Sequence, residues 1–497
     1  MKKRIVGFVI ILFALSLLAL ILVFYKKSKA PIPSEAICQD CNVILITMTN
    51  LRYDHMSSNG YFRPTTPNLD AFAKESLVFD NAFAHSSWTL PEGISIYTGF
   101  YPYQHGIMNR YDGSKLASNI PTLIDILNSN GYKTAAFTGG FDYNPEFGLT
   151  NRFLEYQECA KGQTASYPRQ RGPRGSSTSE YGEFNCTIPS ALDWLKINSN
   201  NKFFLHIQGF DAHCPFSQKG GYIFDNDYTG SIDYSECLWT FDRTKPIIKN
   251  GKTLYPVYSA KTGTSSAVLL GEKDIDHLAA VYDEAIRFAD EKIGLFLREV
   301  RDIGLSENTI IIFTSEHGDM FGKHGRFMRG GPLRGTFYDD VLHIPLIIKN
   351  PKISAKKIDG LVGHVDLIPT LFDFLGLREK FITSGKNQVR LGKSLLPLIL
   401  NNQEINEYIF AGSEFTPAQN NIYFSQKTRV DVVRNKNWKL IQETIFDSAR
   451  ENPSQTVELY NIVNDKEELN NLASTKRNIL DNLNSRLLYW LKQLTID

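Results

Sequence analysis

Short apolar runs of strand length alternate along this chain with stretches that have a helical pattern. The strand-like runs cover residues 42–47, 133–138, 203–210, 309–314 and 344–348. The helix-like stretches cover residues 68–76, 120–130, 189–196 and 274–300. Strands that alternate with helices usually form a parallel sheet covered on both faces. The pattern therefore predicts an α/β fold with a doubly wound, mostly parallel sheet flanked by helices.

Two segments interrupt this alternation. Residues 161–185 are rich in Arg, Gly and Ser, and residues 218–266 are rich in Gly, Tyr and Lys. Such composition is typical of loops and insertions, and loops on a rigid scaffold often carry recognition. We expect both segments to be loops that shape the mouth of a pocket.

The last part of the chain has a different pattern. Strand-like runs follow one another at residues 428–433, 438–443 and 457–462, and an amphipathic helical pattern covers residues 476–491. We therefore predict a main α/β domain over residues 42–378 and a small C-terminal α+β subdomain over residues 379–497.

An uncharged apolar run covers residues 5–25 and has basic residues on both sides. As a helix it would extend about 31 Å, which matches a hydrocarbon core of about 30 Å. A cleaved signal peptide is the alternative, but its candidate cleavage site, Ser28-Lys29-Ala30, is followed by Pro31. We predict a transmembrane anchor over residues 5–25 and a polar tether over residues 26–41. The balanced basic flanks leave the orientation open.

Charge and cysteines narrow the choice of compartment and partner. The 54 basic and 53 acidic side chains give a net charge of +1, so no long-range field favours nucleic acid. The six cysteines follow the apolar run, which permits disulfides in an oxidising compartment. Cys38 and Cys41 have the spacing of a redox or zinc pair, but no second such pair completes a zinc site.

Polar side chains follow several of the predicted strands, where parallel sheets gather their ligands. Thr49 and Asn50 follow the first strand, His213 follows the strand at 203–210, and Glu316 and His317 follow the strand at 309–314. These residues are candidates for a binding site, although each also has an ordinary interpretation as a polar strand end.

Residues 86–99 read as a turn that leads into a helix, with Thr89 near its start and Pro91 in its first turn. Backbone N–H groups and the helix dipole favour an oxyanion at such a place, where a hydroxyl can act as a nucleophile. The alternative is that Thr89 only caps the helix.

In their order along the chain, these segments resemble the sulfatase family of the alkaline phosphatase superfamily. The matching segments are residues 42–55, 63–70, 79–82, 98–106, 314–318, 322–325 and 364–370. The resemblance implies a doubly wound sheet, a divalent cation, and a nucleophile that attacks sulfur or phosphorus in an ester. It also implies a body on the extracytoplasmic (periplasmic or extracellular) side of the cell membrane, held there by a single span.

The resemblance also locates a metal site, and this sequence departs from the family pattern there. Thr49 and Asn50 stand where the family has one or two aspartates, and Glu316 replaces the usual aspartate before His317. The implied ligands are Asn50, Glu316, His317 and Thr49. Glu92 and Asp319 are further candidates for a second carboxylate, although neither stands at a ligand position of the family pattern. A hard cation such as Ca²⁺ prefers several oxygen ligands, so this set predicts Ca²⁺, or else Mg²⁺, Mn²⁺ or Zn²⁺, bound weakly or lost.

The nucleophile position departs as well. Sulfatases that use formylglycine have Cys or Ser where this chain has Thr89, and Thr cannot form that aldehyde. Thr is the nucleophile in the family's phosphoethanolamine and glycerophosphate transferases. The resemblance implies that His213 protonates the leaving group or holds the oxyanion, and that Arg334 neutralises substrate charge. The basic residues expected after the second strand are replaced by Thr138-Gly139-Gly140.

Three hypotheses follow. The first is a sulfuric or phosphoric ester hydrolase with Thr89 as nucleophile. The second is a catalytically inactive protein that binds an anionic glycan, lipid or protein. The third is a phosphoethanolamine- or glycerophosphate-type transferase. A hydroxyl needs a cation or a base beside it to react, so that neighbourhood discriminates between catalysis and binding.

Overall fold

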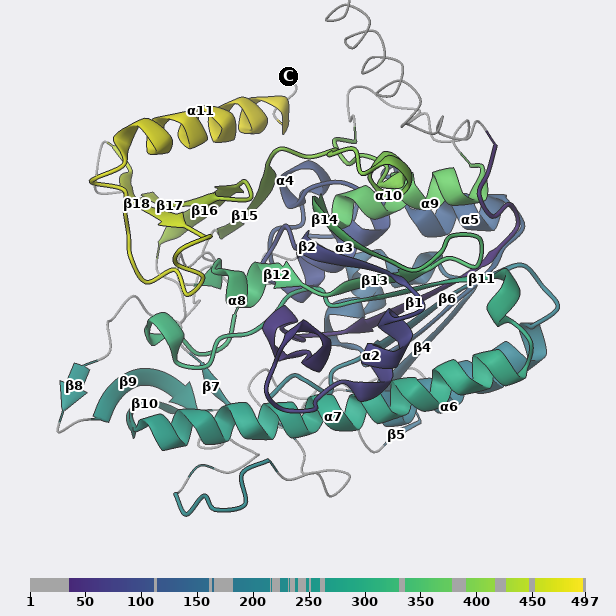
Figure 1. Cartoon of the computed structure of the whole chain (residues 1–497), viewed down its shortest axis with the longest axis horizontal. Helices are drawn as coiled ribbons and strands as arrows, with labels where there is room; N and C mark the ends of the chain where they lie inside the picture. The colour runs from purple at the N-terminus through teal and green to yellow at the C-terminus, as the bar shows by residue number, and fades with distance from the viewer. Residues whose placement is uncertain are drawn as a thin grey trace, which may run out of the picture.

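The computed structural model shows a large α/β unit with a smaller antiparallel sheet at its side (Figure 1). It describes residues 35–110, 114–160, 163–164, 182–214, 216, 224–230, 232, 237–239, 247–249, 252–259, 264–329, 336–377, 390–415, 426–446 and 452–494.

A sheet of ten strands forms the centre of the described chain. Its order is β12 (His343–Ile344), β2 (Leu77–Phe83), β13 (Leu346–Lys349), β11 (Thr309–Thr314), β1 (Asn42–Met48), β6 (Phe203–Gly209), β3 (Lys133–Thr138), β4 (Glu155–Ala160) and β5 (Gln163–Thr164), with β14 (Lys356–Gly363) paired to β2. β11, β1, β6, β3 and β4 run parallel to one another. The carboxyl ends of these strands therefore lie at one edge of the sheet, where the site residues were predicted.

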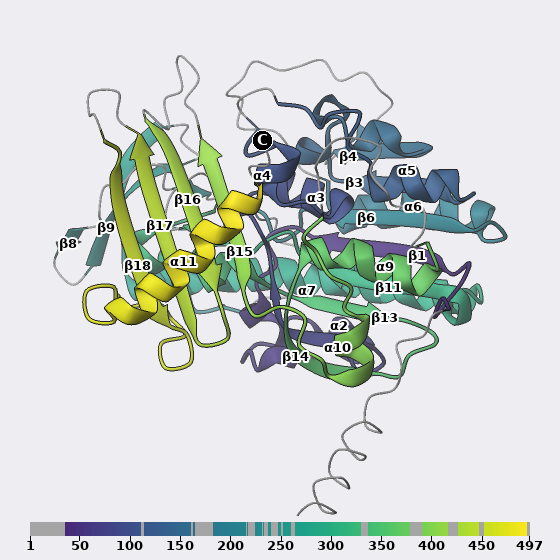
Figure 2. The same ribbon diagram turned by 90° about the horizontal axis from the view of Figure 1, so that it is seen from above.

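Helices cover both faces of this sheet (Figures 1 and 2). One face carries α2 (Pro67–Ala73), α6 (Phe184–Asn198) and α7 (Glu272–Asp302). The other carries α3 (Thr89–Thr98), α5 (Leu123–Ser129), α9 (Leu367–Leu375) and α10 (Leu396–Asn401). Along β1, Ile44 and Ile46 pack on the face that carries α2, α6 and α7. Val43 and Leu45 pack on the opposite face, which carries α3, α5, α9 and α10. Because both faces are covered, β1 is an unbroken apolar run, which is why it was recognisable in the sequence.

The sheet is mixed, because one side of it is antiparallel. β13 runs antiparallel to β11, and β2 runs antiparallel to β13 and β12. The run at residues 344–348 was predicted as one strand, but it is divided between β12 and β13 at Pro345. Proline has no N–H to donate to the ladder, so the strand is interrupted there.

Residues 218–266 were predicted as a loop or an insertion, and the described part of this segment contains strands. β9 (Lys252–Ser259) and β10 (Thr264–Leu270) form an antiparallel pair, and β7 (Leu238–Trp239) and β8 (Ile247–Lys249) join β9. Of the other predicted loop, residues 163–164 form β5 and residues 184–185 begin α6, while residues 161–162 and 165–181 lie outside the described chain.

The C-terminal region forms the expected antiparallel sheet and helix. The sheet contains β15 (Ile409–Phe415), β16 (Lys427–Arg434), β17 (Trp438–Phe446) and β18 (Ser454–Asn461). α11 (Arg477–Leu494) crosses one face of it, as Figure 2 shows, and buries Leu483, Leu487 and Trp490. The short helices α4 (Pro102–His105) and α8 (Asp339–Leu342) lie close to this sheet (Figure 1).

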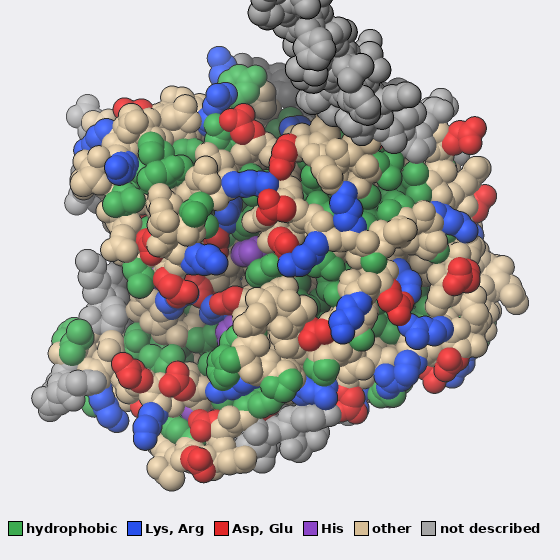
Figure 3. All heavy atoms as spheres, in the orientation of Figure 1, with side chains coloured by type: hydrophobic (Ala, Val, Ile, Leu, Met, Phe, Trp, Pro, Cys, Tyr) green, Lys and Arg blue, Asp and Glu red, His purple; other side chains and the backbone are tan. Residues whose placement is uncertain are grey.

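The cysteines pair as three disulfides, Cys38–Cys41, Cys159–Cys186 and Cys214–Cys237. The predicted anchor at residues 5–25 lies outside the described residues, and within them no helix is both long and apolar enough to cross a bilayer. Basic and acidic side chains are interspersed over the face seen in Figure 3, in agreement with the net charge of +1.

Candidate active site

Polar residues that follow β1, β6 and β11 meet at the carboxyl edge of the sheet. Thr47 of β1 pairs with Thr314 of β11, and Met48 pairs with Gly209 of β6. This register brings the two candidate metal-binding segments, which start at Thr49 and Glu316, to the same place. The residues predicted there are all buried: Thr49, Asn50, His213, Glu316 and His317.

Thr89 is the first residue of α3, and its hydroxyl points into this site. The residue before the helix is Trp88, which has an extended conformation and provides no side-chain cap. Thr89 therefore does not serve as the helix cap. Its Oγ1 lies 2.9 Å from Nε2 of His317, in a buried contact.

The hydrogen bonds of His317 define which of its nitrogens carries the proton. Nδ1 lies 2.9 Å from the carbonyl oxygen of Gly318, which can only accept, so Nδ1 carries the hydrogen. Burial and the positive charges of Arg329 and Arg110 lower the pKa of His317. The ring is then neutral, and its Nε2 lone pair accepts the proton of the Thr89 hydroxyl.

A second acceptor beside Thr89 was not predicted from the sequence. Asp142 lies in the short 3₁₀ turn Phe141–Tyr143, after β3, and it is buried. Its Oδ2 accepts a hydrogen bond of 2.6 Å from Arg110. Burial raises the pKa of Asp142, while Arg110, Arg329 and the hydroxyl of Thr89 oppose that rise.

No distinctive pattern marks Asp142 in the sequence, because it lies in the turn beyond the residues that directly follow β3. The sulfatase family pattern has basic residues directly after the strand that is β3 here. This chain has Thr138-Gly139-Gly140 at that place. Gly140 has φ of +83°, a conformation that favours glycine and turns the chain back toward α3. Asp142 and Tyr143 follow this turn, and both reach the site.

Glu316 is fully buried at the end of β11. Its Oε1 accepts a hydrogen bond of 2.9 Å from the hydroxyl of Tyr143. Burial raises the pKa of Glu316, and the hydroxyls of Tyr143, Thr47 and Thr49 oppose the rise. Its Oε2 has no hydrogen-bond partner among the described residues. A buried carboxylate oxygen without a partner is costly unless something else occupies the space in front of it.

The side chain of Asn50 has a second buried oxygen that lacks a hydrogen-bond partner among the described residues. Its backbone has φ of +74°, and the hydroxyl of Tyr282 donates to its carbonyl at 2.7 Å. The side-chain amide donates to Oδ2 of Asp319 at 2.7 Å, which directs the amide N toward that carboxylate. Oδ1 of Asn50 then remains without a partner in the described part of the chain.

The two unpartnered oxygens fit a hard cation, because Ca²⁺ and Mg²⁺ bind carboxylate and amide oxygens. The described residues hold no group of three or more acidic, histidine or cysteine side chains arranged for a metal. Asn50 is not one of these residue types, and its unpartnered amide oxygen is a further oxygen that can add to a set built on Glu316.

Two further carboxylates were expected as alternatives, and they differ in position. Asp319 lies against Asn50, at the edge of the same group. Glu92 is directed away from it, because its Oε2 accepts from the backbone N–H of His85 at 2.8 Å and its Oε1 lies 2.6 Å from Nδ1 of His364.

Positive charge in the site comes from Arg110 and Arg329. Burial lowers the pKa of His213 most, and Arg329, Arg110 and His317 lower it further, so His213 lies within the same group of charges. Arg329 was not predicted. Arg334, which was predicted to neutralise the substrate, lies outside the described residues.

Comparison with known protein families identifies the family of this chain. The pattern described as Sulfatase matches residues 41–377, which is most of the chain and includes every residue of the site. The chain belongs to the sulfatase family. The family belongs to the alkaline phosphatase superfamily, and the sulfatase relatives support a sulfuric ester hydrolase-like enzyme.

Individual relatives agree with the family. Arylsulfatase K of Xenopus laevis is 26% identical over 443 residues, which cover 82% of this chain and 74% of that protein. The arylsulfatase of Clostridium perfringens is 26% identical over 377 residues, covering 67% of this chain and 74% of that protein.

Solved structures share the fold of this sulfatase-family chain. The phosphonate monoester hydrolase of Agrobacterium radiobacter superposes with a TM-score of 0.65 at 19% identity, over 91% of this chain and 96% of the other. A protein solved with its substrate D-glucosamine-2-N,6-O-disulfate superposes with a TM-score of 0.64 at 20% identity, over 91% of this chain and 98% of the other.

Proposed function

We propose that this sulfatase-family chain hydrolyses a sulfate ester, with the hydroxyl of Thr89 as its nucleophile. The observation that carries the proposal is the 2.9 Å contact between Thr89 Oγ1 and an acceptor nitrogen of neutral His317. A threonine hydroxyl has a pKa far above neutrality, so it attacks only where an adjacent group takes its proton.

We propose Asp142 as the alternative acceptor, which takes that proton directly from the Thr89 hydroxyl and not through His317. Its carboxylate lies beside the Thr89 hydroxyl, and Arg110 holds it in place through an ion pair of 2.6 Å. The Thr89 oxygen bonds to sulfur, the bond from sulfur to the alcohol oxygen breaks, and water then cleaves the threonine sulfate.

His213 and Arg329 are proposed to act on the substrate. A sulfate group that enters brings negative charge close to His213, which counteracts the effect of Arg329 and Arg110 on its pKa. Burial is the largest cause of the low pKa of His213, so the imidazole acts as the acid only where the charge of the bound ester protonates it, and it then passes that proton to the departing alcohol oxygen. Arg329 neutralises the sulfate, a role that Arg334 also remains a candidate for.

The residues that would hold a divalent cation, by preference Ca²⁺, are Asn50 and Glu316, with Thr49 and Asp319 at the margin. His317 was also expected as a ligand, but its one lone pair, on Nε2, is directed at Thr89. The support is the pair of unpartnered oxygens, Asn50 Oδ1 and Glu316 Oε2. A bound cation would stabilise negative charge on an ester oxygen and lower the pKa of a nearby hydroxyl.

The substrate class we propose is a sulfated saccharide. The relative solved with D-glucosamine-2-N,6-O-disulfate is named for such a ligand, and the fold here is the same. A phosphoric ester is the alternative within this chemistry, because Thr serves as nucleophile toward phosphorus in the family's transferases.

We also propose that residues 5–25 anchor the chain, with its body on the extracytoplasmic side. The three disulfides support this location, since such bonds persist in oxidising compartments. Protease digestion of intact cells tests the proposal: cleavage of the body without lysis supports it, and protection until lysis contradicts it.

The function itself is tested with purified full-length chain, 4-nitrophenyl sulfate and 4-nitrophenyl phosphate, each with and without Ca²⁺. Calcium binding is measured in parallel by calorimetry, beside Glu316→Ala. Turnover of the sulfate that is enhanced by Ca²⁺, with binding lost in Glu316→Ala, supports the proposal. No turnover of either ester with any of Ca²⁺, Mg²⁺, Mn²⁺ and Zn²⁺ contradicts it.

The second candidate function is binding of a sulfated ligand without turnover. The observation that favours it is that Thr49 and Asn50 replace carboxylates at the end of β1, which lowers the charge available to a cation. Binding of a sulfated saccharide by a chain that never cleaves it would establish this second function.

A further inference from the structure

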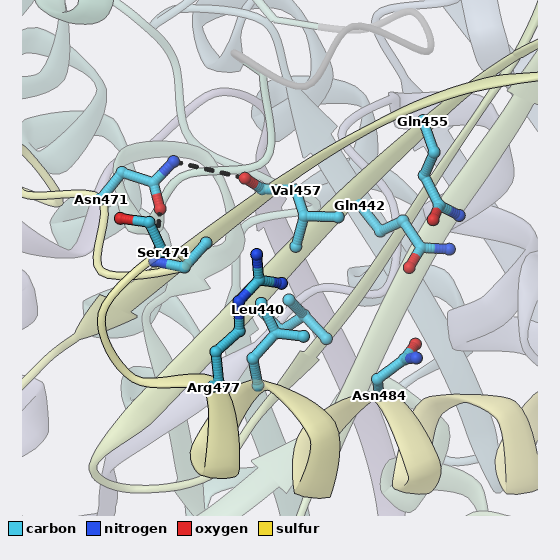
Figure 4. Close-up of a pocket in the computed structure, with 10 residues that line it drawn as sticks. Leu440, Gln442, Gln455, Val457, Asn471, Ser474, Arg477 and Asn484 are labelled. Atoms are coloured by element: carbon cyan, nitrogen blue, oxygen red, sulfur yellow. Dashed lines mark hydrogen bonds between the residues drawn. The ribbon is translucent and has the colours of Figure 1, made fainter.

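A groove in the C-terminal region lies between α11 and the sheet, apart from the active site (Figure 4). It encloses about 510 Å³, within the usual range for small-molecule sites of about 300 to 1,000 Å³. Its lining comes from β17, β18, the segment before α11, and α11 itself: Leu440, Gln442, Gln455, Val457, Asn471, Ala473, Ser474, Arg477, Leu480 and Asn484.

Several side chains in this groove are polar although their positions face the core between α11 and the sheet, where apolar residues are expected. Leu440 and Gln442 are two residues apart on β17, so they project from the same face of the sheet. Leu440 pairs with Leu459 of β18 and is packed under α11, whereas Gln442 pairs with Val457. A glutamine therefore occupies a position where an apolar residue would continue the core.

The same exception occurs on the helix. Leu480, Leu483 and Leu487 of α11 recur at helical spacing and pack against the sheet. Asn484 lies within this apolar stripe, and its Oδ1 is buried without a partner among the described residues. Polar groups at core positions are unfavourable for folding and are expected mainly where function retains them.

Gln442 supplies the independent evidence for a ligand. It is only 8% exposed, and it lines the groove. Figure 4 shows the amides of Gln442 and Gln455 close together above Asn484, with Arg477 at the start of α11. Asn471 differs from these, because its amide donates to the Val457 carbonyl and shapes the wall.

The lining chemistry points to one kind of ligand. An amide donates and accepts at once, as neighbouring sugar hydroxyls require, and three amides converge here. Leu440, Val457 and Leu480 give an apolar floor for the C–H face of a sugar ring. Arg477 is exposed at the mouth, it has no ion pair with the described residues, and the lining contains no carboxylate. A guanidinium in this setting favours a sulfate oxygen.

We propose that this groove is a second, non-catalytic binding site for a sulfated sugar unit, which holds a saccharide while the active site acts on it. The choice of ligand rests on the proposed function, but its binding does not require turnover.

The test is calorimetric titration of the full-length chain with D-glucosamine 6-sulfate, in a Thr89→Ala background that keeps the ester intact. D-glucosamine and inorganic sulfate are the comparison probes. The groove is altered by Gln442→Leu and Arg477→Ala. Lys476→Ala is the matched control, because Lys476 is the adjacent exposed cation and does not line the groove.

The expected result is that Gln442→Leu and Arg477→Ala each weaken one binding equivalent by about tenfold or more, as loss of a hydrogen bond to a charged or buried group predicts. Lys476→Ala leaves that equivalent intact, and Gln442→Leu raises the Tm because an apolar residue completes the core. If the active site does not bind the ester, one equivalent remains in the parent and disappears in the groove variants, which separates the two proposals.

Equal affinity of the parent and both groove variants overturns the proposal. Absence of any binding of the sulfated sugar overturns it too, and so does inorganic sulfate binding as tightly as the sulfated sugar, since the site then recognises only an anion. A loss of binding in Gln442→Leu accompanied by a lower Tm also contradicts it, because the glutamine is then structural.

Discussion

The Thr89 hydroxyl and Nε2 of His317 lie 2.9 Å apart although 228 positions separate them in the chain. Thr89 begins α3 on one layer of the fold, and His317 follows β11 in the sheet. Because His317 gives its own hydrogen to the Gly318 carbonyl, it can only accept from Thr89. The fold therefore places a hydroxyl against a base in a buried setting, and this relationship underlies the first two predictions.

Thr89→Ala removes the proposed nucleophile. We expect kcat for 4-nitrophenyl sulfate to fall by about a thousandfold or more, as loss of a covalent nucleophile does elsewhere. Thr89→Ser keeps the hydroxyl and should retain measurable turnover. Circular dichroism of both variants checks that the fold is intact. If Thr89→Ala turns over as fast as the parent, another residue attacks the ester.

Asp142→Asn removes the second acceptor beside Thr89 while it preserves shape. We expect kcat to fall by about 10² to 10⁴ with little change in KM, the range for loss of a general base. Asp125→Asn is the matched control, because Asp125 also pairs with an arginine, Arg152, at 2.6 Å. The measurement is the steady-state kcat of each variant. If Asp142→Asn and Asp125→Asn have the same kcat, Asp142 only positions Arg110.

Glu92→Gln should flatten the dependence of stability on pH. Burial raises the pKa of Glu92 from 4.5 to about 7. The folded state therefore favours its neutral form, and the stability this contributes is present below pH 4.5 and is lost as pH rises to about 7. The loss should amount to about 3 kcal/mol. Urea unfolding of parent and variant at steps across this range measures it.

The control for that series is Glu75→Gln. Glu75 lies on the surface, and a hydrogen bond from Lys349 lowers its pKa, so its contribution has the opposite sign and is lost as pH falls. If the unfolding free energy of Glu92→Gln depends on pH with the same slope as that of the parent, another buried acid is responsible.

Lys439→Met should destabilise the junction between the C-terminal sheet and the main domain. The Lys439 side chain is fully buried on β17, and its Nζ lies 2.8 Å from carboxylate oxygens of Asp339 and Glu468. Removing one member of a buried ionic group leaves uncompensated charge, which costs about 3 to 5 kcal/mol of unfolding free energy.

Urea denaturation of Lys439→Met is compared with Lys436→Met, whose lysine is more exposed and pairs with Asp359 and Glu404 on the surface. The surface change should cost less than about 1 kcal/mol. Similar losses in the two variants would mean that the buried group contributes no more than surface pairs.

The sequence by itself predicted the parallel centre of the sheet, most of its covering helices and the C-terminal sheet. It could do so because strands such as β1, buried on both faces, are continuous apolar runs, and α7 and α11 carry one-sided apolar patterns. The order of short motifs also indicated the sulfatase family, which the comparisons confirmed, and it selected Thr89 and His317, which the fold places in contact.

Only the tertiary structure decided the antiparallel side of the sheet, the hairpin of β9 and β10, and the partners of Thr89. β2 lies between β14 and the pair β12 and β13, and β14 pairs with β2, but the polar residues in both strands leave no continuous apolar run that would mark them in the sequence. Asp142 and Arg110 have no distinctive spacing from Thr89, because their roles depend on how the turn after β3 packs against α3. Local sequence determines local conformation and burial, whereas the approach of residues far apart in the chain is determined by how the layers pack.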